Sequence, residues 1–123
     1  MTDNRTKPEI DAPEGPAPQE LVIRDIIVGD GAEAKPGDNV TVHYVGVEYE
    51  SGEEFDSSWV RGETIQFPLR GLIQGWQDGI PGMKVGGRRQ LIIPPDLAYG
   101  DRGAGHAIAP GETLIFVCDL VSV

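Results

Sequence analysis

Hydrophobic and polar residues alternate through much of the chain after residue 20, which is the pattern of β-strands that bury one face. Val40, Val42 and Tyr44 share one face of such a strand, because alternate side chains of a strand point the same way. The same kind of pattern predicts further strands over residues 21–28, 66–68, 88–93 and 114–121. We therefore expect a sheet of about five strands.

One short helix is predicted between these strands. Leu72, Trp76 and Ile80 are spaced four residues apart and so fall on one stripe of an α-helix. The Pro81-Gly82 pair that follows is a typical helix stop. The sequence thus predicts an α+β fold, in which a curved antiparallel sheet of about five strands wraps around one short α-helix.

Residues 1–19 differ in composition from the rest of the chain. They are rich in proline, alanine and charged residues, and Ile10 is their only branched aliphatic residue. A segment of this kind buries too little apolar surface to offset the entropy lost on ordering. We predict a disordered N-terminal tail over residues 1–19 and one folded domain over residues 20–123, a usual length for a single core.

The net charge of −10 narrows the range of partners. Nucleic acids and anionic membranes are bound through clusters of basic side chains, and the one such cluster here is small. No apolar run is long enough to span a membrane, and residues 1–20 lack the apolar core of a secretory signal. The single cysteine, Cys118, permits no intramolecular disulfide. We expect a cytoplasmic monomer that binds neither nucleic acid nor membrane.

Two patterns suggest a cofactor or a metal, but each fits another interpretation better. The segment 29–34 (GDGAEA) has the spacing of a dinucleotide-binding loop, which needs a helix directly after it. The segment 35–37 (KPG) follows instead and favours a turn. Zinc needs three or four ligands at workable spacing, whereas His43, His106 and Cys118 are scattered. We predict no cofactor and no metal.

Catalytic side chains of the usual kinds are also hard to find. Ser57 and Ser58 lack a surrounding G-x-S-x-G motif, and serine hydroxyls in such a position typically hold a turn. The carboxylates within residues 53–56 could form a glycosidase pair, although 20 acidic residues bring carboxylates together by chance. Asp56 stands apart from this run because it follows Phe55, at the edge of an apolar stretch.

Aromatic residues recur close to glycines along the chain. They are Tyr44, Phe55, Phe67, Trp76, Tyr99 and Phe116. Each of them, taken alone, fits an ordinary core. Taken together they also fit a partly open apolar pocket, because buried Trp and Tyr side chains need partners for their polar atoms. The residues by themselves leave both interpretations open.

A set of short motifs gives these residues a specific order. The motifs are Val42-His43-Tyr44-Val45-Gly46, Phe55-Asp56-Ser57-Ser58, Ile73-Gln74-Gly75-Trp76, residues 79–87, Pro94-Pro95-Asp96-Leu97-Ala98-Tyr99-Gly100 and Leu114-Ile115-Phe116. In this order and spacing, across about residues 21–123, the chain resembles the FK506-binding-protein family of peptidyl-prolyl isomerases. The resemblance implies an antiparallel sheet wrapped around a short helix, a proline-binding pocket between them, and catalysis of X-Pro bond rotation without a cofactor.

The resemblance also implies roles for individual residues. Trp76 would form the floor of the pocket, and Asp56 would lie at its edge, held by Arg61. The Tyr99 hydroxyl and the Ile73 backbone N–H would hydrogen-bond carbonyl groups of the substrate. The implied catalytic residues are Asp56, Tyr99 and Tyr44, and the implied binding residues are Phe55, Arg61, Ile65, Leu72, Ile73, Trp76, Ile108 and Phe116. Ile65 stands where many members place an aromatic residue. The implied partners are proline-containing segments of folding proteins and macrolides of the FK506 or rapamycin type.

An apolar pocket suits X-Pro isomerisation because bond rotation requires no nucleophile. Resonance gives the amide a rotational barrier of ~18–20 kcal/mol, and water stabilises the planar, charge-separated amide more than the twisted one. Two other interpretations remain open at this stage. The pocket could bind proline-containing or unfolded segments with little turnover, or the aromatic residues could form nothing more than a core.

Overall fold

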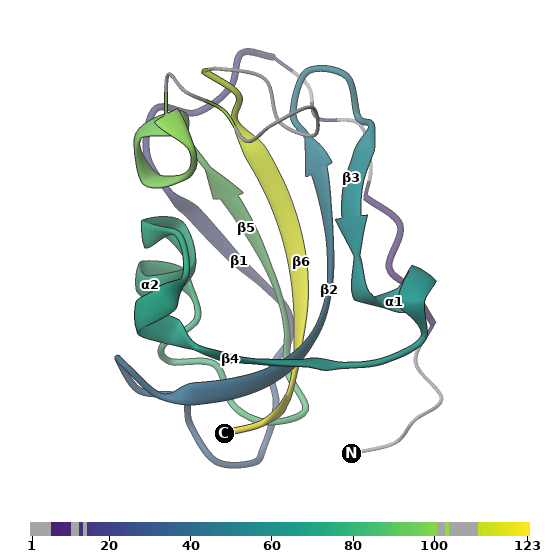
Figure 1. Ribbon diagram of the computed structural model, residues 1–123, viewed down its shortest axis with the longest axis vertical. Helices are drawn as coiled ribbons and strands as arrows, with labels where there is room; N and C mark the ends of the chain where they lie inside the picture. The colour runs from purple at the N-terminus through teal and green to yellow at the C-terminus, as the bar shows by residue number, and fades with distance from the viewer. Residues whose placement is uncertain (1–5, 11–12, 14, 101–102, 104–110) are drawn as a thin grey trace.

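The computed structural model, which describes residues 6–10, 13, 15–100, 103 and 111–123, contains one six-stranded antiparallel sheet (Figure 1). Its strands are β1 (Val22–Ile27), β2 (Asn39–Glu48), β3 (Glu54–Ser57), β4 (Ile65–Pro68), β5 (Arg88–Ile93) and β6 (Leu114–Ser122). The strand order is β1-β5-β6-β2-β3, and β4 pairs with the first half of β2. The predicted α+β fold is confirmed, with six strands in place of about five. The extra strand arises because one edge of the ten-residue β2 is shared between β4 and β3.

Two short α-helices and two 3-10 turns complete the fold. They are α1 (Ser58–Arg61), η1 (Leu69–Gly71), α2 (Gln74–Gly79) and η2 (Pro95–Leu97). The predicted helix is α2, which is shorter than its apolar stripe, since Leu72 precedes it and Ile80 forms its C-cap. Gly75 lets α2 approach the sheet closely, because a Cβ there would collide with the Ile93 side chain of β5.

The helix α1 was not predicted from the sequence. It is one turn long, too short to show a helical period. The Ser57 hydroxyl caps its N-terminus by accepting hydrogen bonds from Trp59 N at 3.2 Å and Val60 N at 3.4 Å. Gly62 ends it with φ of 76°, a left-handed conformation that glycine adopts readily. The expectation that Ser57 holds a turn is therefore confirmed.

The inner face of the sheet, toward α2, carries the main core. Alternation along each long strand sends one set of side chains inward, as predicted for 40–44 and 114–121. This face is made of Val40, Val42, Tyr44, Leu91, Ile93, Leu114, Phe116, Cys118 and Leu120, with Trp76 and Ile80 packed on it from α2. Burial raises the pKa of the Cys118 thiol, which fits the role of a small core residue.

The outer face of the sheet is also apolar and buried in its middle. Val45 and Val47 of β2 lie opposite Val117 and Ile115 of β6, and all four are buried. Ile10 and Ala17, from the segment before β1, pack against this face. Residues 1–5, 11–12 and 14 of the predicted tail lie outside the described residues. The division at residue 20 stays a prediction.

The glycine-rich connection after β1 contains no helix, in agreement with its interpretation as a turn. Gly31 N donates to Val85 O at 3.0 Å, and Ala34 N donates to Met83 O at 2.8 Å, so the connection is tied to the loop before β5. Across the described ranges no helix is long and apolar enough to cross a membrane, and no group of three or more side chains is arranged to hold a metal ion.

Candidate functional site

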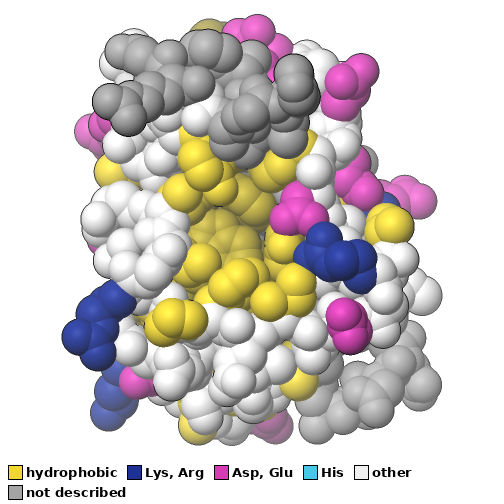
Figure 2. All heavy atoms as spheres, viewed as in Figure 1, with side chains coloured by type: hydrophobic (Ala, Val, Ile, Leu, Met, Phe, Trp, Pro, Cys, Tyr) yellow, Lys and Arg dark blue, Asp and Glu magenta, His cyan; other side chains and the backbone are white. Residues whose placement is uncertain are grey.

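An open cavity of about 170 Å³ lies between the inner face of the sheet and α2. Nine residues line it: Tyr44, Phe55, Asp56, Phe67, Leu72, Ile73, Trp76, Tyr99 and Phe116. Figure 2 shows this hollow as a hydrophobic surface in the middle of the molecule, with an acidic and a basic side chain at one edge. The lining is brought together from β2, β3, β4, β6, the start of α2 and the residues after η2.

The floor of the cavity is a set of aromatic rings packed edge to face. The Trp76 ring, in a residue only 4% exposed, meets Phe116 at 5.2 Å, Tyr44 at 5.4 Å and Phe67 at 6.0 Å between ring centroids. Each pair is close to perpendicular, an arrangement that aromatic quadrupoles favour. These contacts hold the rings in fixed orientations, so the floor of the cavity has a defined shape.

Gly46 of β2 makes room for two of the walls. A Cβ at this position would lie 2.6 Å from Phe55 Cζ and 2.8 Å from Phe116 Cε1, both closer than real contacts allow. The Phe55 and Phe116 rings meet edge to face over this glycine, with centroids 5.5 Å apart. The glycine is therefore needed for close approach of the two rings, not for an unusual backbone conformation.

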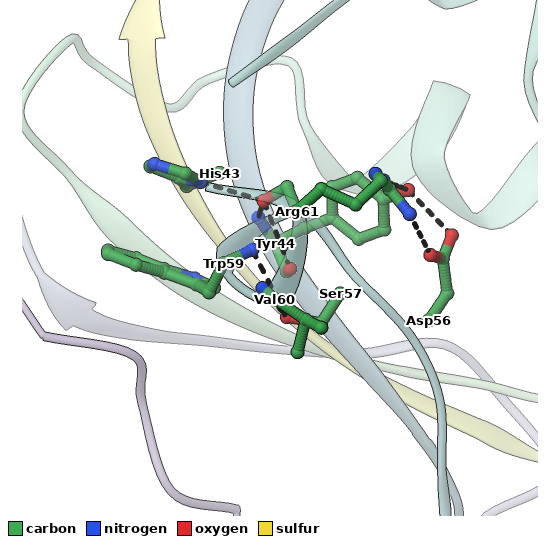
Figure 3. Close-up of polar contacts among 8 residues, drawn as sticks. His43, Tyr44, Asp56, Ser57, Trp59, Val60 and Arg61 are labelled. Atoms are coloured by element: carbon green, nitrogen blue, oxygen red, sulfur yellow. Dashed lines mark hydrogen bonds and ion pairs between the residues drawn. The ribbon is translucent and has the colours of Figure 1, made fainter. Parts of the chain in front are cut away.

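One edge of the cavity is a three-membered polar cluster (Figure 3). The Tyr44 hydroxyl donates to Asp56 Oδ2 at 2.6 Å, and Arg61 Nη1 donates to Asp56 Oδ1 at 2.7 Å. Arg61 Nη2 also donates to the Tyr44 hydroxyl at 3.0 Å, which closes the triangle. Asp56 comes from β3 and Arg61 from the last turn of α1, so the capped turn at Ser57 sets the distance between them.

The cluster fixes the charge state of its members. Partial burial by itself would raise the pKa of Asp56, but the hydrogen bonds from Tyr44 and Arg61 outweigh it and lower that pKa below its ordinary value. Burial, followed by the bond to the Asp56 carboxylate, raises the pKa of Tyr44 to about 12. At neutral pH the edge therefore holds a carboxylate, a neutral phenol and a guanidinium.

Two residues of the lining carry hydrogen-bond donors that the described residues leave without an acceptor. Tyr99, which is 38% exposed, lines the opening, and burial together with the charge of Asp56 raises the pKa of its hydroxyl. Within the described part of the chain, no residue accepts a hydrogen bond from this hydroxyl or from the Ile73 backbone N–H. Their role toward a substrate stays a prediction.

Ser58 supports the edge from behind, a role that the sequence did not reveal. Its hydroxyl accepts from Tyr44 N at 2.7 Å and donates to Tyr44 O at 3.2 Å, where β2 changes partner from β4 to β3. The hydroxyl thus takes the place of a missing strand partner for Tyr44. His43 Nδ1 lies 2.8 Å from the same oxygen, and the His43 ring stacks on Trp59 with centroids 4.0 Å apart.

Serine and histidine form nucleophile–base pairs in many enzymes, but the position of Ser58 and His43 in this structure does not suit that role. Ser58 is completely buried, and its oxygen is engaged by the Tyr44 backbone. Neither residue lines the cavity. A nucleophile must reach its substrate, so this pair serves the architecture of the edge.

The cavity brings together most of the residues expected from the sequence. Its lining includes eight of them: Tyr44, Phe55, Asp56, Leu72, Ile73, Trp76, Tyr99 and Phe116. Arg61 reaches the edge through Asp56. Ile65 packs against the core and is not part of the lining, whereas Phe67, two residues later on β4, is. Ile108 lies outside the described residues. The alternation of β4 was a signal for Phe67, since residues 65 and 67 share a face and Phe67 has the longer reach.

Known proteins share this arrangement across nearly the whole chain. The family model described as FKBP-type peptidyl-prolyl cis-trans isomerase matches residues 31–121. A protein of Corynebacterium glutamicum described as a probable FK506-binding protein is 69% identical over 116 residues, which cover 94% of this chain and 98% of that protein. The FK506-binding protein of Streptomyces anulatus is 62% identical over 120 residues, or 95% of this chain and 97% of that protein.

Solved structures show the same fold at lower identity. FkpA from Escherichia coli has a TM-score of 0.78 and 42% identity, covering 83% of this chain and 47% of that chain. The structure titled AtFKBP13 has a TM-score of 0.77 and 41% identity, covering 86% of this chain and 94% of that chain. The coverage of the second is close to complete on both sides, so the similarity concerns a compact single domain.

Proposed function

Because the chain belongs to the FKBP-type peptidyl-prolyl cis–trans isomerase family, and is therefore an enzyme that isomerises X-Pro bonds, we propose that it works by binding a twisted X-Pro amide above Trp76. The observation that carries this mechanism is the cavity itself. It has an aromatic floor, a charge-neutralised edge and two donors without an acceptor among the described residues, and the lining that the structure describes contains no serine, threonine, cysteine, lysine or histidine.

The apolar floor accounts for the rate enhancement. A planar amide is stabilised by resonance and by water around its charge-separated form, and rotation costs ~18–20 kcal/mol. Transfer of the bond from water to the aromatic cavity removes part of that stabilisation, while the twisted state loses less. Lowering the barrier by roughly 5 kcal/mol gives a rate increase on the order of 10³ to 10⁴. Only preferential binding of the transition state is required.

The polar groups orient the substrate within this cavity. The Tyr99 hydroxyl and the Ile73 N–H donate to carbonyl oxygens on either side of the rotating bond. Asp56 lies beside the substrate carbonyl, and its position is held by Tyr44 and Arg61. No proton moves in this scheme, so no group in the cavity needs a pKa near neutrality.

The roles of Asp56 and Tyr99 can be tested by substitution. We expect Asp56→Ala and Tyr99→Phe each to lower kcat/KM by about two- to tenfold, the effect of losing a hydrogen bond worth ~0.5–1.4 kcal/mol. The measurement is NMR exchange on an X-Pro peptide, which needs no coupling protease. Tyr49→Phe makes the same chemical change on the outer face and should leave kcat/KM unchanged. Folded Asp56→Ala and Tyr99→Phe variants with wild-type kcat/KM would rule out the assigned roles.

The same assay separates the proposed mechanism from simpler uses of the cavity. We propose that proline-containing segments of folding proteins are the substrates, and that a macrolide of the FK506 or rapamycin type fills the same cavity, in line with the names of the relatives. Exchange that is catalysed and blocked by the drug supports this proposal. Drug binding without catalysed exchange would indicate a binding module. If the protein neither binds the drug nor catalyses exchange, the aromatic residues form only a structural core. The acidic surface and single cysteine support action as a cytoplasmic monomer.

A further inference from the structure

The outer face of the sheet, on the side away from the proline pocket, carries a continuous apolar row. Val22, Ile92, Ile115 and Val47 lie side by side across β1, β5, β6 and β2. Ile115 is 1% exposed and Val47 is 7% exposed, values as low as those of the inner core. An antiparallel sheet with its helix on one face commonly leaves the other face to water. Burial of this depth requires another layer.

The segment that precedes β1 provides apolar cover for this face. Ile10 and Ala17 pack on the cluster of Val47, Tyr49 and Ile115. Ile10 is the only branched aliphatic residue among the first 19, and it lies at this contact. The largest apolar side chain of the described part of the segment is thus placed against the sheet, together with Ala17.

Polar contacts tie the same segment to three strands. The Tyr49 hydroxyl, just after β2, lies 3.3 Å from Gly15 O and 3.2 Å from Pro16 O and donates to them. Lys7 Nζ pairs with Glu54 of β3 at 2.5 Å, where the segment runs past β3 in Figure 1. Arg88 of β5 donates to Thr6 O at 3.0 Å.

The contact of Arg88 with Thr6 is built on a buried ion pair. Arg88 Nε and Nη2 donate to the two carboxylate oxygens of Asp119 on β6, at 2.6 Å and 2.9 Å. Asp119 is almost completely buried on the outer face. A bidentate pair of this kind holds the guanidinium in one orientation, which directs the second N–H of Nη2 at the Thr6 carbonyl.

The proline content of the segment also favours this arrangement. Proline restricts the unfolded chain, which reduces the entropy lost when the segment is ordered. It also has no N–H that would need a partner on the sheet. Composition alone predicts a disordered tail, but that prediction counts only the apolar surface of the segment and leaves out the apolar surface of the sheet that it covers.

We propose that the outer face is a docking surface for the chain's own N-terminal segment, residues 6–10, 13 and 15–20, which form a strap across the sheet. The strap covers the outer face of the sheet, as α2 covers the inner face, and it acts independently of the proline pocket. Its anchors are Ile10 and Ala17, with Lys7 and the Thr6 carbonyl as polar ties.

Matched substitutions in the full-length chain test the strap. Ala17→Asp places a carboxylate against the sheet, and Gln19→Asp places one two residues away at an exposed position. We expect Ala17→Asp and Ile10→Asp to lower Tm by roughly 4–8 °C, and Gln19→Asp to leave Tm within about 1 °C of the wild type. Equal Tm values for all three variants would overturn the proposal.

NMR can test the contact between the strap and the sheet directly, without a measurement of stability. In the wild-type protein, methyl groups of Ile10 should show NOEs to methyl groups of Val47 and Ile115. Their absence would show an undocked tail and overturn the proposal. In a mixture of labelled and unlabelled chains, NOEs between chains would mean that a second copy supplies the strap, which would overturn its assignment to the same chain.

Measurements of kcat/KM distinguish the strap proposal from the proposed function. Because the strap lies on the face opposite the pocket, folded Ile10→Asp should keep kcat/KM within about twofold of the wild type. A larger loss of kcat/KM in the folded variant would contradict independence from the pocket. Loss of activity in Asp56→Ala or Tyr99→Phe with unchanged NOEs from Ile10 would support both proposals.

Discussion

The two faces of the sheet are both apolar, yet one holds an open cavity and the other is closed. On the inner face, Tyr44, Phe116 and Trp76 meet edge to face and leave about 170 Å³ unfilled. On the outer face, Val47 and Ile115 are aliphatic, branched at Cβ, and sealed against their neighbours. Strands β2 and β6 contribute to both sets, whereas Trp76 comes from α2, which packs on the inner face alone.

The comparison shows that two apolar faces of one sheet differ in what covers them. On the inner face, rings held by edge-to-face contacts line the cavity without closing it, whereas on the outer face Ile10 and Ala17 pack directly on Val47 and Ile115. Gly46 shows how narrow the tolerance is, because the room beside it belongs to the rings of Phe55 and Phe116. An apolar face thus becomes a pocket where its lining is held in place by neighbouring groups and is left uncovered.

The strongest test of the comparison asks whether the outer face is a true core. We expect Ile115→Ala on the outer face and Leu91→Ala on the inner face each to lower the free energy of unfolding by about 2–5 kcal/mol. Both residues are almost completely buried in the native chain, so both substitutions leave a cavity. Urea unfolding of the two variants gives the measurement.

The comparison of the two losses in unfolding free energy is more informative than either value alone. An exposed isoleucine would lose less than about 1 kcal/mol on truncation, within the range of ordinary surface substitutions. A small loss for Ile115→Ala beside a large loss for Leu91→Ala would therefore mean that the outer face is open in solution. Comparable losses would mean that the sheet has two cores.

The next effect in size concerns Ser58, which connects the two faces. Its hydroxyl bonds the backbone of Tyr44, an inner-face residue, and lies 2.8 Å from Nδ1 of His43 on the outer side. Ser58→Ala leaves the buried Tyr44 N–H unpaired, and we expect a loss of about 1–3 kcal/mol in unfolding free energy. Ser57→Ala, which removes a helix cap one residue earlier, is the matched control, with an expected loss of ~1 kcal/mol.

Ser58→Ala should also show whether the support that Ser58 gives to Tyr44 affects catalysis. Because Ser58 holds the Tyr44 backbone, its loss should loosen the Tyr44–Asp56 bond and lower kcat/KM by a few-fold in the folded variant. Ser58→Thr keeps the hydroxyl and should restore the Tyr44 contacts wherever its methyl group is accommodated. Wild-type stability and kcat/KM in Ser58→Ala would show that the bond to Tyr44 has no consequence.

Sequence patterns predicted those parts of the molecule in which neighbours along the chain share an environment. Strand β5 was predicted residue for residue, and β6 differs from the predicted span by one residue, because each has one uniformly buried face. The helix α2 was located through Trp76, but the apolar stripe extends beyond it, since Leu72 lies before the helix and Ile80 is its C-cap, and both pack inward.

Features that depend on contacts between distant segments could not be predicted in this way. The bond from Ser58 to Tyr44 arises where β2 changes partner, and nothing near Ser58 in the sequence marks that change. Alternation places Ile65 and Phe67 on one face of β4, but it does not tell which of the two meets Trp76 at the floor of the cavity, and Phe67 does. Ile10 gave no sign of its contact, because the sheet that it covers comes later in the chain.

The smallest effect tests the electrostatics at the end of the sheet, where the carboxyl of Glu112 meets that of Glu48, whereas Asp56 meets the guanidinium of Arg61. Glu112 shares a hydrogen bond with Glu48, and this bond, followed by burial and the charges of Glu48 and Glu50, raises the pKa of Glu112 from 4.5 to about 7.

The folded state therefore holds the proton of Glu112 more tightly than the unfolded state does, so the stabilisation is complete below pH 4.5 and is lost as the pH rises through 7. Glu112→Gln removes this loss, and because Glu112 is only partly buried we expect a gain in unfolding free energy of less than about 1 kcal/mol at pH 8, or up to ~4 °C in Tm, with no difference at pH 4.5. Glu63→Gln removes one charge at an exposed position and corrects for the change in net charge. A constant difference between Glu112→Gln and wild type across this pH range would mean that the two carboxyls do not share a proton.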